Sequence, residues 1–220
     1  MRRRVLVTAG PTWEPIDAVR VLSNRSTGGM GTAIAAAAAD AGHRVTLLLG
    51  PPCPAPAART GLDVHRFGSS LDLEAALAAR FPACELLVMA AAVADHRPAA
   101  PAAGKLPRAG RLTLDLEAVP DLVAACAARR GPGQRIVSFS LEEAEQLETR
   151  AAAKLAAKGV DAAVANPVAT LGSAGVDAVL LHAGGHRERP GPMTKAAFAA
   201  WLVGRAEALF DAPAEPDRGS

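Results

Sequence analysis

Residues 4–49, RVLVTAGPTWEPIDAVRVLSNRSTGGMGTAIAAAAADAGHRVTLLL, decide the fold. A short apolar, β-branched run over residues 4–9 ends at Gly10-Pro11, which is typical of a buried strand. A long loop follows, and residues 30–42 then predict an alanine-rich helix that ends at Ala-Gly. Residues 44–49 form a second apolar run. A strand, a helix and a strand in this order predict a βαβ unit, the element of a doubly wound parallel sheet.

The same alternation continues along the chain. We predict further strands at residues 63–66, 85–91, 135–140, 160–165 and 176–182, and further helices at residues 71–81, 121–129, 142–158 and 194–209. Two other segments differ from this pattern. Residues 96–110 are rich in Pro, Ala and Gly and predict an exposed flap, whereas residues 112–117 (LTLDLE) alternate with period two and predict a half-exposed antiparallel strand.

We therefore expect an α/β fold, a doubly wound, mostly parallel Rossmann-like sheet with an antiparallel extension and a Pro/Ala-rich flap. Residues 1–210 would form a single domain, and residues 211–220 a flexible tail.

Composition excludes several classes of protein. Half of the 220 residues are hydrophobic and the formal net charge is +2, which excludes a disordered chain and does not favour nucleic acid or an anionic membrane as partner. Three cysteines far apart predict neither a disulfide framework nor a zinc site. His182 and His186 flank a Gly-Gly turn without a third ligand, so we expect no protein-built metal site. The first apolar run is too short for a signal peptide, and we expect a cytoplasmic protein.

The loop before the first helix is suited to an anion. It contains Ser26, Thr27, Gly28 and Gly31, small residues that let backbone N–H groups approach a phosphate at a helix N-terminus. The alternative is a helix cap in which the glycines serve close packing. The loop lacks the GxGxxG and GxxxxGK[ST] patterns, and the second strand ends without an acidic residue, so NAD, NADP and a P-loop are disfavoured.

Lysine is scarce, because only four of the 24 basic residues are lysines. Lys105 lies in the flap, ten residues after Asp95. Lys154 and Lys158 are one helical turn apart and share a face, which indicates either phosphate binding or a solvated surface.

Several segments, in this order, resemble phosphopantothenate–cysteine ligase, also called phosphopantothenoylcysteine synthetase. They are residues 8–31, MAAAVADHRP (89–98), the lysine of GKLPR (104–108), SFSLEE (138–143) and VANP (164–167). The resemblance covers residues 4–209 and implies the stand-alone form, with a separate decarboxylase as possible partner. It implies that a nucleoside triphosphate, CTP with Mg²⁺, activates 4′-phosphopantothenate as an acyl-nucleotidylate, that cysteine then attacks, and that the enzyme is a homodimer.

The resemblance also implies residue roles. Asn24, Lys105 and Arg20 would act in catalysis, with the Asn24 amide donating to the developing oxyanion. Ser26, Thr27, Gly28 and Gly31 would form the substrate loop. The residues that would bind the nucleotide are Gly10, Met89, Ala90, Ala91, Asp95, Lys105, Phe139, Ser140, Leu141, Glu142, Lys154, Lys158 and Asn166.

The chain departs from the family at several positions. The family often has a lysine at the position of Gly29 and an aspartate at the position of Pro167. Two other functions stay open: a flavin- or NAD(P)-linked reductase, and a non-catalytic nucleotide-binding paralogue. The sequence contains no GxSxG motif and no convincing Cys–His pair, so nothing in it indicates a covalent nucleophile.

Overall fold

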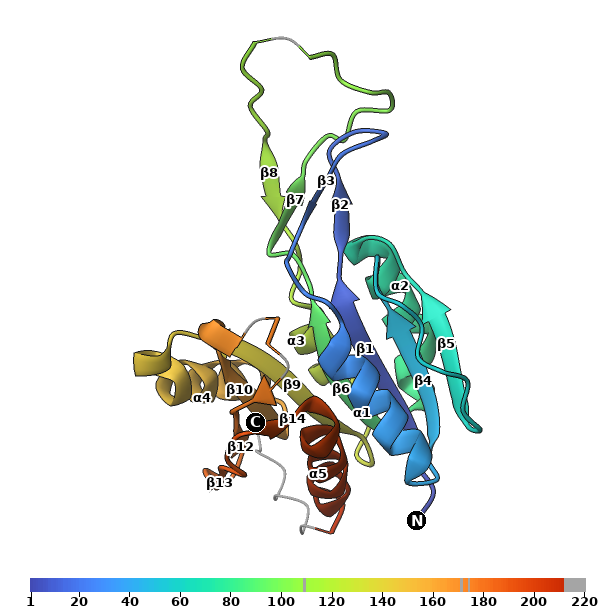
Figure 1. The fold of residues 1–220 in the computed structure, drawn as a ribbon, viewed down its shortest axis with the longest axis vertical. Coiled ribbons are helices and arrows are strands. Elements are labelled where there is room, and N and C mark those ends of the chain that lie inside the picture. The colour runs from blue at the N-terminus through green and yellow to red at the C-terminus, as the bar shows by residue number, and fades with distance from the viewer. Residues whose placement is uncertain (109, 171, 174, 212–220) are drawn as a thin grey trace.

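An eight-stranded sheet forms the centre of the computed structural model, which describes residues 1–108, 110–170, 172–173 and 175–211 (Figure 1). Its strand order is β13-β12-β10-β9-β6-β1-β4-β5. The six strands from β10 to β5 pair in parallel, and β12 and β13 extend the sheet antiparallel. This confirms the expected fold class. The strands are β1 (Arg4–Pro11), β4 (Arg44–Leu49), β5 (Leu62–Arg66), β6 (Leu86–Ala92), β9 (Arg135–Glu142), β10 (Ala162–Pro167), β12 (Val179–His182) and β13 (Arg187–Glu188).

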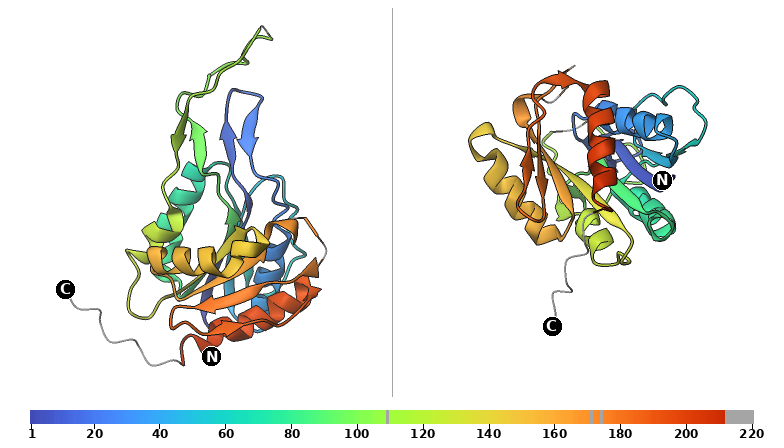
Figure 2. Two further views of the ribbon diagram at one scale, coloured as in Figure 1. Left: turned by 90° about the vertical axis from the view of Figure 1, so that its left-hand side faces the viewer. Right: turned by 90° about the horizontal axis from the view of Figure 1, so that it is seen from below.

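Helices cover both faces of this sheet (Figure 2). Side chains alternate along β1, so Val5 and Val7 pack on one face and Leu6 on the other. The first face is covered by α1 (Gly29–Asp40) and α5 (Lys195–Ala208). The second is covered by α2 (Ser70–Arg80), α3 (Leu122–Ala127) and α4 (Leu147–Lys158). Strand β1 is buried because it lies between two parallel neighbours and under helices on both sides.

Helix α1 packs very closely on β1. A Cβ atom on Gly31 would lie 2.6 Å from the Ala9 Cβ and 2.7 Å from the Thr8 carbonyl oxygen. No side chain fits at this position, so the glycine fixes the distance between the helix and the strand. The loop that precedes α1 is thereby held at the carboxyl end of β1.

The loop expected after the first strand contains a β-hairpin, so that prediction was wrong. Strands β2 (Trp13–Pro15) and β3 (Val21–Ser23) pair antiparallel, and beside them β7 (His96–Pro98) pairs with β8 (Leu116–Ala118). Together these two ribbons form an arm that projects beyond the sheet (Figure 1). The predicted strand at 112–117 is confirmed only where β7 lies opposite it. One backbone hydrogen bond, from the Ala99 N–H to the Asp115 carbonyl (3.0 Å), extends this ribbon past the last strand pair, Pro98 and Leu116.

Three other predicted boundaries were wrong. The helix expected at 142–158 begins only at Leu147, after a 3₁₀ turn (Ala144–Gln146), because β9 continues to Glu142 and pairs with β10. The strand expected at 176–182 is divided: β11 (Gly175–Val176) pairs with β14 (Met193–Thr194) apart from the main sheet. The helix expected at 121–129 ends at Ala127. The predicted tail beyond Asp211 lies outside the described residues.

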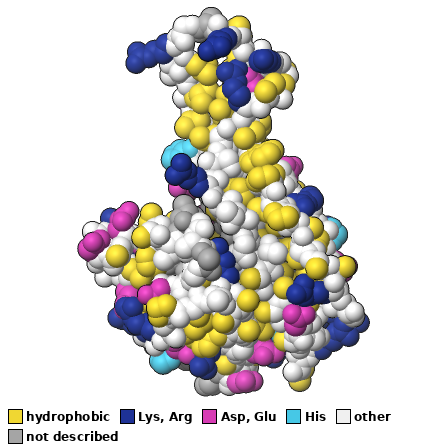
Figure 3. Space-filling view, viewed as in Figure 1, with side chains coloured by type: hydrophobic (Ala, Val, Ile, Leu, Met, Phe, Trp, Pro, Cys, Tyr) yellow, Lys and Arg dark blue, Asp and Glu magenta, His cyan; other side chains and the backbone are white. Residues whose placement is uncertain are grey.

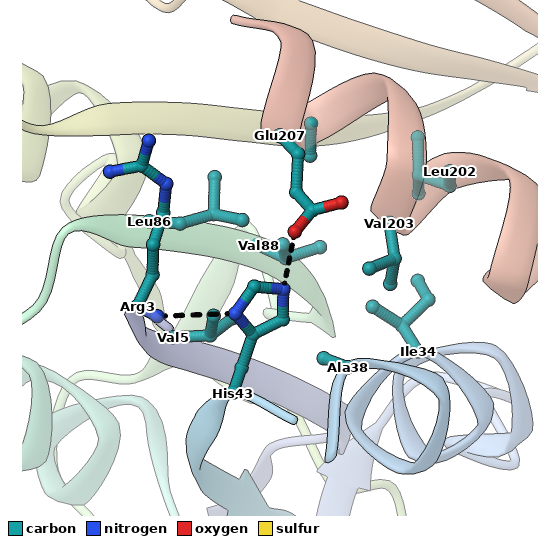
Figure 4. Close-up of a pocket in the computed structure, with 11 residues that line it drawn as sticks. Arg3, Val5, Ile34, Ala38, His43, Leu86, Val88, Leu202, Val203 and Glu207 are labelled. Atoms are coloured by element: carbon teal, nitrogen blue, oxygen red, sulfur yellow. Dashed lines mark hydrogen bonds and ion pairs between the residues drawn. The ribbon is translucent and has the colours of Figure 1, made fainter. Parts of the chain in front are cut away.

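A small cavity of about 10 Å³ lies near the amino ends of the strands (Figure 4). There the buried His43 ring accepts a hydrogen bond from the Arg3 backbone N–H at Nδ1 (3.2 Å), and its Nε2 lies 2.9 Å from Glu207 Oε1. The cavity has room for about one water molecule, so it is too small for a ligand site. The contacts of His43 with Arg3 and Glu207 link α5 to the sheet. Among the described residues, no helix has the length and apolar character to cross a membrane.

The contact at Gly31 generates a stability prediction. Replacing Gly31 with Val should lower the free energy of unfolding by about 3 kcal/mol, because overpacking forces α1 away from β1. Chemical denaturation measures this value. Gly204→Ala is the matched control, because that exposed helix position is open, and should be neutral or stabilising by up to ~1 kcal/mol. Equal stability of Gly31→Val and the wild type would contradict the close contact.

Candidate functional site

Two adjoining clefts open at the carboxyl ends of the parallel strands. The first, here called the lysine cleft, has a volume of about 580 Å³ and lies between the end of β6, β9, α3 and α4. It brings together ten of the residues predicted from the sequence: Asn24, Ser26, Met89, Ala91, Asp95, Phe139, Ser140, Leu141, Lys154 and Lys158.

The second, here called the glycine-loop cleft, has a volume of about 220 Å³ and lies at the starts of α1 and α5. The predicted residues that line it are Ser26, Thr27, Gly28, Gly31, Ala90, Ala91, Phe139, Ser140, Leu141 and Asn166. The two clefts share a wall made of Ser26, Ala91, Ala92 and the segment Phe139–Leu141. Ligands in the two clefts would therefore meet at this wall.

Two threonine hydroxyls, of Thr8 in β1 and of Thr12 directly after it, fix the backbone at the end of β6. Thr8 Oγ1 accepts a hydrogen bond from the Ala91 N–H (3.0 Å), and Thr12 Oγ1 accepts one from the Ala94 N–H (3.1 Å). Both threonines are fully buried. The small alanines of this segment then leave space for a ligand above a fixed backbone.

Asn24 also binds this backbone. Its amide nitrogen donates to the carbonyl oxygens of Ala92 (2.9 Å) and Val93 (3.2 Å). Its predicted role as donor to an oxyanion would require these two hydrogen bonds to break. In this conformation Asn24 joins the loop after β3 to the end of β6.

Each lysine of the lysine cleft is paired with a carboxylate. Lys154 Nζ lies 2.6 Å from Glu142 Oε1, and Lys158 Nζ lies 3.0 Å from Asp121 Oδ2. Burial opposes ionisation of Glu142, but the hydrogen bonds from Lys154 and Ser140 outweigh it and lower the pKa of that carboxyl. Glu142, which was predicted to bind the nucleotide, is 4% exposed, is not among the residues that line either cleft, and holds Lys154 in place.

Sequence reasoning missed Asp121. This residue caps α3 by accepting from the Val123 and Ala124 N–H groups (both 3.0 Å), and it lines the lysine cleft with Pro120. Burial alone would raise the pKa of Asp121, but these donors and Lys158 lower it. A Pro-Asp pair directly before a helix is a sequence signal for such a cap.

Gly10, which was predicted to bind the nucleotide, packs against Cys53 beneath the glycine loop. It lines neither cleft. Its φ is +87°, and a Cβ there would lie 2.7 Å from Cys53 Sγ; at Gly28 (φ +70°) the distance would be 2.6 Å. The two glycines therefore allow the strand end and the loop to pack against Cys53.

Arg20, between β2 and β3, and Lys105, between β7 and β8, belong to the arm and line neither cleft. The Asp17 carboxylate forms an ion pair with Arg20 and accepts from the Leu106 N–H (3.0 Å), while Arg20 Nη2 donates to the Leu106 carbonyl (3.0 Å). Arg20 holds the pKa of Asp17 well below its usual range. The contacts of Asp17 with Arg20 and Leu106 therefore stabilise the arm fully at pH values above the usual pKa of an aspartate, and this stabilisation is lost as the pH falls toward the lowered pKa. Lys105, next to Leu106, is exposed.

Among the described residues, no three His, Cys, Asp or Glu side chains form a metal-binding group. His182 and His186 serve structure instead. The His182 Nε2 lies 2.9 Å from Glu188 Oε1, and the two histidine rings are 5.4 Å apart.

A family model, curated relatives and solved structures all match this chain over most of its length. Residues 1–209 match the family model described as the DNA/pantothenate metabolism flavoprotein C-terminal domain. A cysteine/cysteine sulfinic acid decarboxylase from an unknown prokaryotic organism is 38% identical over 165 residues, which cover 74% of this chain and 45% of that protein. The coenzyme A biosynthesis bifunctional protein CoaBC of Vibrio cholerae is 38% identical over 174 residues, 77% of this chain and 43% of that protein.

The chain thus spans less than half the length of these two curated relatives. The crystal structure of the C-terminal domain of a CoaBC protein is 27% identical, with a TM-score of 0.81, and the match covers 95% of this chain and 96% of that one.

Proposed function

The chain belongs to the family of DNA/pantothenate metabolism flavoprotein C-terminal domains, and from this premise we propose that it joins 4′-phosphopantothenate to L-cysteine at the expense of a nucleoside triphosphate. The observation that carries this proposal is the pair of adjoining clefts with a common wall. A ligase of this kind must bring an activating nucleotide and a carboxylate into contact, which two joined clefts allow.

The nucleotide would occupy the lysine cleft. Its volume lies within the range of ligand pockets, and Lys154 and Lys158 supply positive charge for phosphates. Phe139 offers a flat surface on the common wall. The choice of CTP rests on the resemblance of residues 89–98 and 138–143. A reductase is a weaker candidate, because the end of β4 carries no acid for a dinucleotide ribose.

The reaction would proceed in two steps. The carboxylate of 4′-phosphopantothenate attacks the α-phosphorus of the nucleotide, the bond to the β-phosphate breaks, and pyrophosphate leaves. The cysteine amine then attacks the acyl carbon, a proton is lost, the amide forms, and the nucleoside monophosphate leaves. Lys154 and Lys158 would offset the charge on the phosphates in the first step.

Magnesium ion fits this chemistry. Asp95 lines the lysine cleft and offers hard oxygen donors beside the expected phosphates, as suits an ion bound largely through its nucleotide. The ion would supply further charge neutralisation on the triphosphate.

Asn24 would position the cysteine amine for the second step. Among the described residues, no donor is within hydrogen-bond distance of its amide oxygen. That oxygen would accept from the incoming cysteine amine, while the amide nitrogen stays bound to the end of β6. The donor role that the resemblance implies would instead require the amide nitrogen to leave the Ala92 and Val93 carbonyls.

The arm would form a homodimer. Figure 3 shows hydrophobic side chains along the arm. The exposed large hydrophobic residues of the arm are Trp13, Val19, Val21, Leu112, Leu114 and Leu116. Exposed apolar patches of this kind mark protein interfaces. Since Arg20 and Lys105 lie outside the clefts of their own chain, the dimer would bring them to the nucleotide of the second copy. A decarboxylase that consumes the product is the second proposed partner.

A pyrophosphate assay tests the activity. We expect release that requires 4′-phosphopantothenate, with CTP preferred over ATP, and amide product only when cysteine is added. Pyrophosphate or amide formation that is independent of 4′-phosphopantothenate, or no turnover with any nucleotide, would contradict the proposal.

Asn24→Asp tests the division into two steps. The carboxylate cannot donate to the Ala92 and Val93 carbonyls and would repel them, so amide formation should fall by at least ~100-fold. Pyrophosphate release in a single turnover should persist. Gln146→Glu, the same amide-to-acid change at an exposed position outside the clefts, is the control. Normal amide synthesis by Asn24→Asp would refute its role.

Mixing two inactive variants tests whether Lys105 acts across the dimer. When Lys105→Ala and Asn24→Asp chains are mixed and re-equilibrated, half of the dimers are mixed, and one of their two sites is intact if Lys105 acts in the partner. Activity should therefore recover to about a quarter of the wild type. No recovery despite verified exchange would show that Lys105 acts in its own chain. A monomer in light scattering would refute the dimer.

A further inference from the structure

Lys195 reaches from one helix into the site of another. It is the first residue of α5, and it lines the glycine-loop cleft. Its Nζ lies 3.6 Å from the position that a Cβ on Gly29 would occupy. Helices α1 and α5 pack side by side on the same face of the sheet (Figure 1). This packing places an ammonium group of the C-terminal helix over the loop at the start of α1.

Lys195 differs from the other two lysines of the site. Lys154 and Lys158 are each paired with a carboxylate, whereas within the described part of the chain no carboxylate lies within 4 Å of the Lys195 ammonium. The first turns of α1 and α5 contain no acidic residue either. A cation at the positive ends of two helices is unfavourable unless an anion joins it. The cleft therefore carries uncompensated positive charge.

The other described residues that line this cleft are uncharged. Met30, Leu141 and Val176 line it together with the glycine loop. Gly28 caps α1 without a side-chain hydrogen bond, and the N–H groups of Gly28 and Gly29 make long hydrogen bonds to Ser26 Oγ (3.3 Å) and Thr27 Oγ1 (3.4 Å), which a phosphate would replace. A ligand that matches these walls has one strongly anionic end and an uncharged body. Its other end would lie at the wall shared with the lysine cleft.

We propose that Lys195 binds the phosphate group of 4′-phosphopantothenate and thereby selects this substrate over pantothenate. This inference rests on the proposed ligase function and adds a specificity-determining residue to it. The phosphate lies at Lys195, and the carboxylate at the other end of the substrate reaches the common wall, where the α-phosphate of the nucleotide is attacked. The lysine cleft then needs to bind only the nucleotide.

Lys195→Met tests this assignment, because methionine keeps most of the length and removes the charge. Loss of a charge-assisted hydrogen bond should raise the KM for 4′-phosphopantothenate by roughly 10- to 100-fold. The KM values for nucleotide and cysteine and the kcat should change less than about threefold. Lys158→Met is the matched control, and its main effect should fall on the nucleotide KM.

A rescue variant separates charge from packing. The nearest atom to a Cβ at Gly29 would be Thr27 Oγ1 at 3.5 Å, which is ordinary contact, so a side chain fits there. Adding Gly29→Lys to Lys195→Met restores an ammonium group over the loop and should recover at least about tenfold in KM. Gly29→Ala in the same background should recover nothing.

Calorimetry keeps the test independent of turnover. Wild-type protein should bind 4′-phosphopantothenate more tightly than pantothenate, and Lys195→Met should lose most of that difference. If amide forms but Lys195→Met leaves this difference intact, the assignment of Lys195 is refuted and the ligase function stands. If no amide forms but the difference depends on Lys195, the ligase function is refuted and the phosphate site stands. No selective binding by the wild type would refute the assignment.

Discussion

The close contact between α1 and β1 is the constraint on which the site depends. Gly31 has no room for a side chain, because the Ala9 Cβ and the Thr8 carbonyl already occupy that space. At the next layer Gly10 and Gly28 pack against Cys53. These contacts fix the glycine loop at the carboxyl end of the sheet. Both clefts border this loop through Ser26, so a shift of α1 would change the shape of both.

Charge is distributed differently in the two clefts. In the lysine cleft Glu142 and Asp121 hold the two lysines in place, and both carboxylates have a lowered pKa. A nucleotide would exchange these carboxylate contacts for phosphate contacts, which limits the gain in free energy per lysine. In the glycine-loop cleft the ammonium of Lys195 has no such partner among the described residues. The second cleft is therefore suited to a single phosphate, and the first to a larger anion held by several groups.

Local patterns in the sequence predicted most of the sheet and its helices. The strand at 44–49 was predicted to the residue, since its apolar run has clear ends at Arg44 and Gly50. The β2–β3 hairpin was missed because each strand has three residues and its pairing depends on the contact with the neighbouring ribbon. Residues 142–146 contain good helix formers, but pairing with β10 overrides this preference at Glu142.

The site was predictable where the resemblance supplied a motif. Most of the expected residues line the two clefts, whereas Arg20 and Lys105 belong to an arm whose direction no local pattern specifies. Asp121 and Lys195 were missed for the same physical reason. Each comes to the site through packing between elements distant in the chain, α3 against α4 and α5 against α1. Such contacts leave no periodic signal in one sequence.

A crystal structure with 4′-phosphopantothenate and a non-hydrolysable CTP analogue would show which cleft each ligand occupies. We expect nucleotide phosphates beside Lys154 and Lys158, the substrate phosphate at Lys195, and the substrate carboxylate facing the α-phosphorus at the wall formed by Ala91 and Phe139. Both ligands in a single cleft, or either one bound away from the carboxyl ends of the strands, would contradict this arrangement.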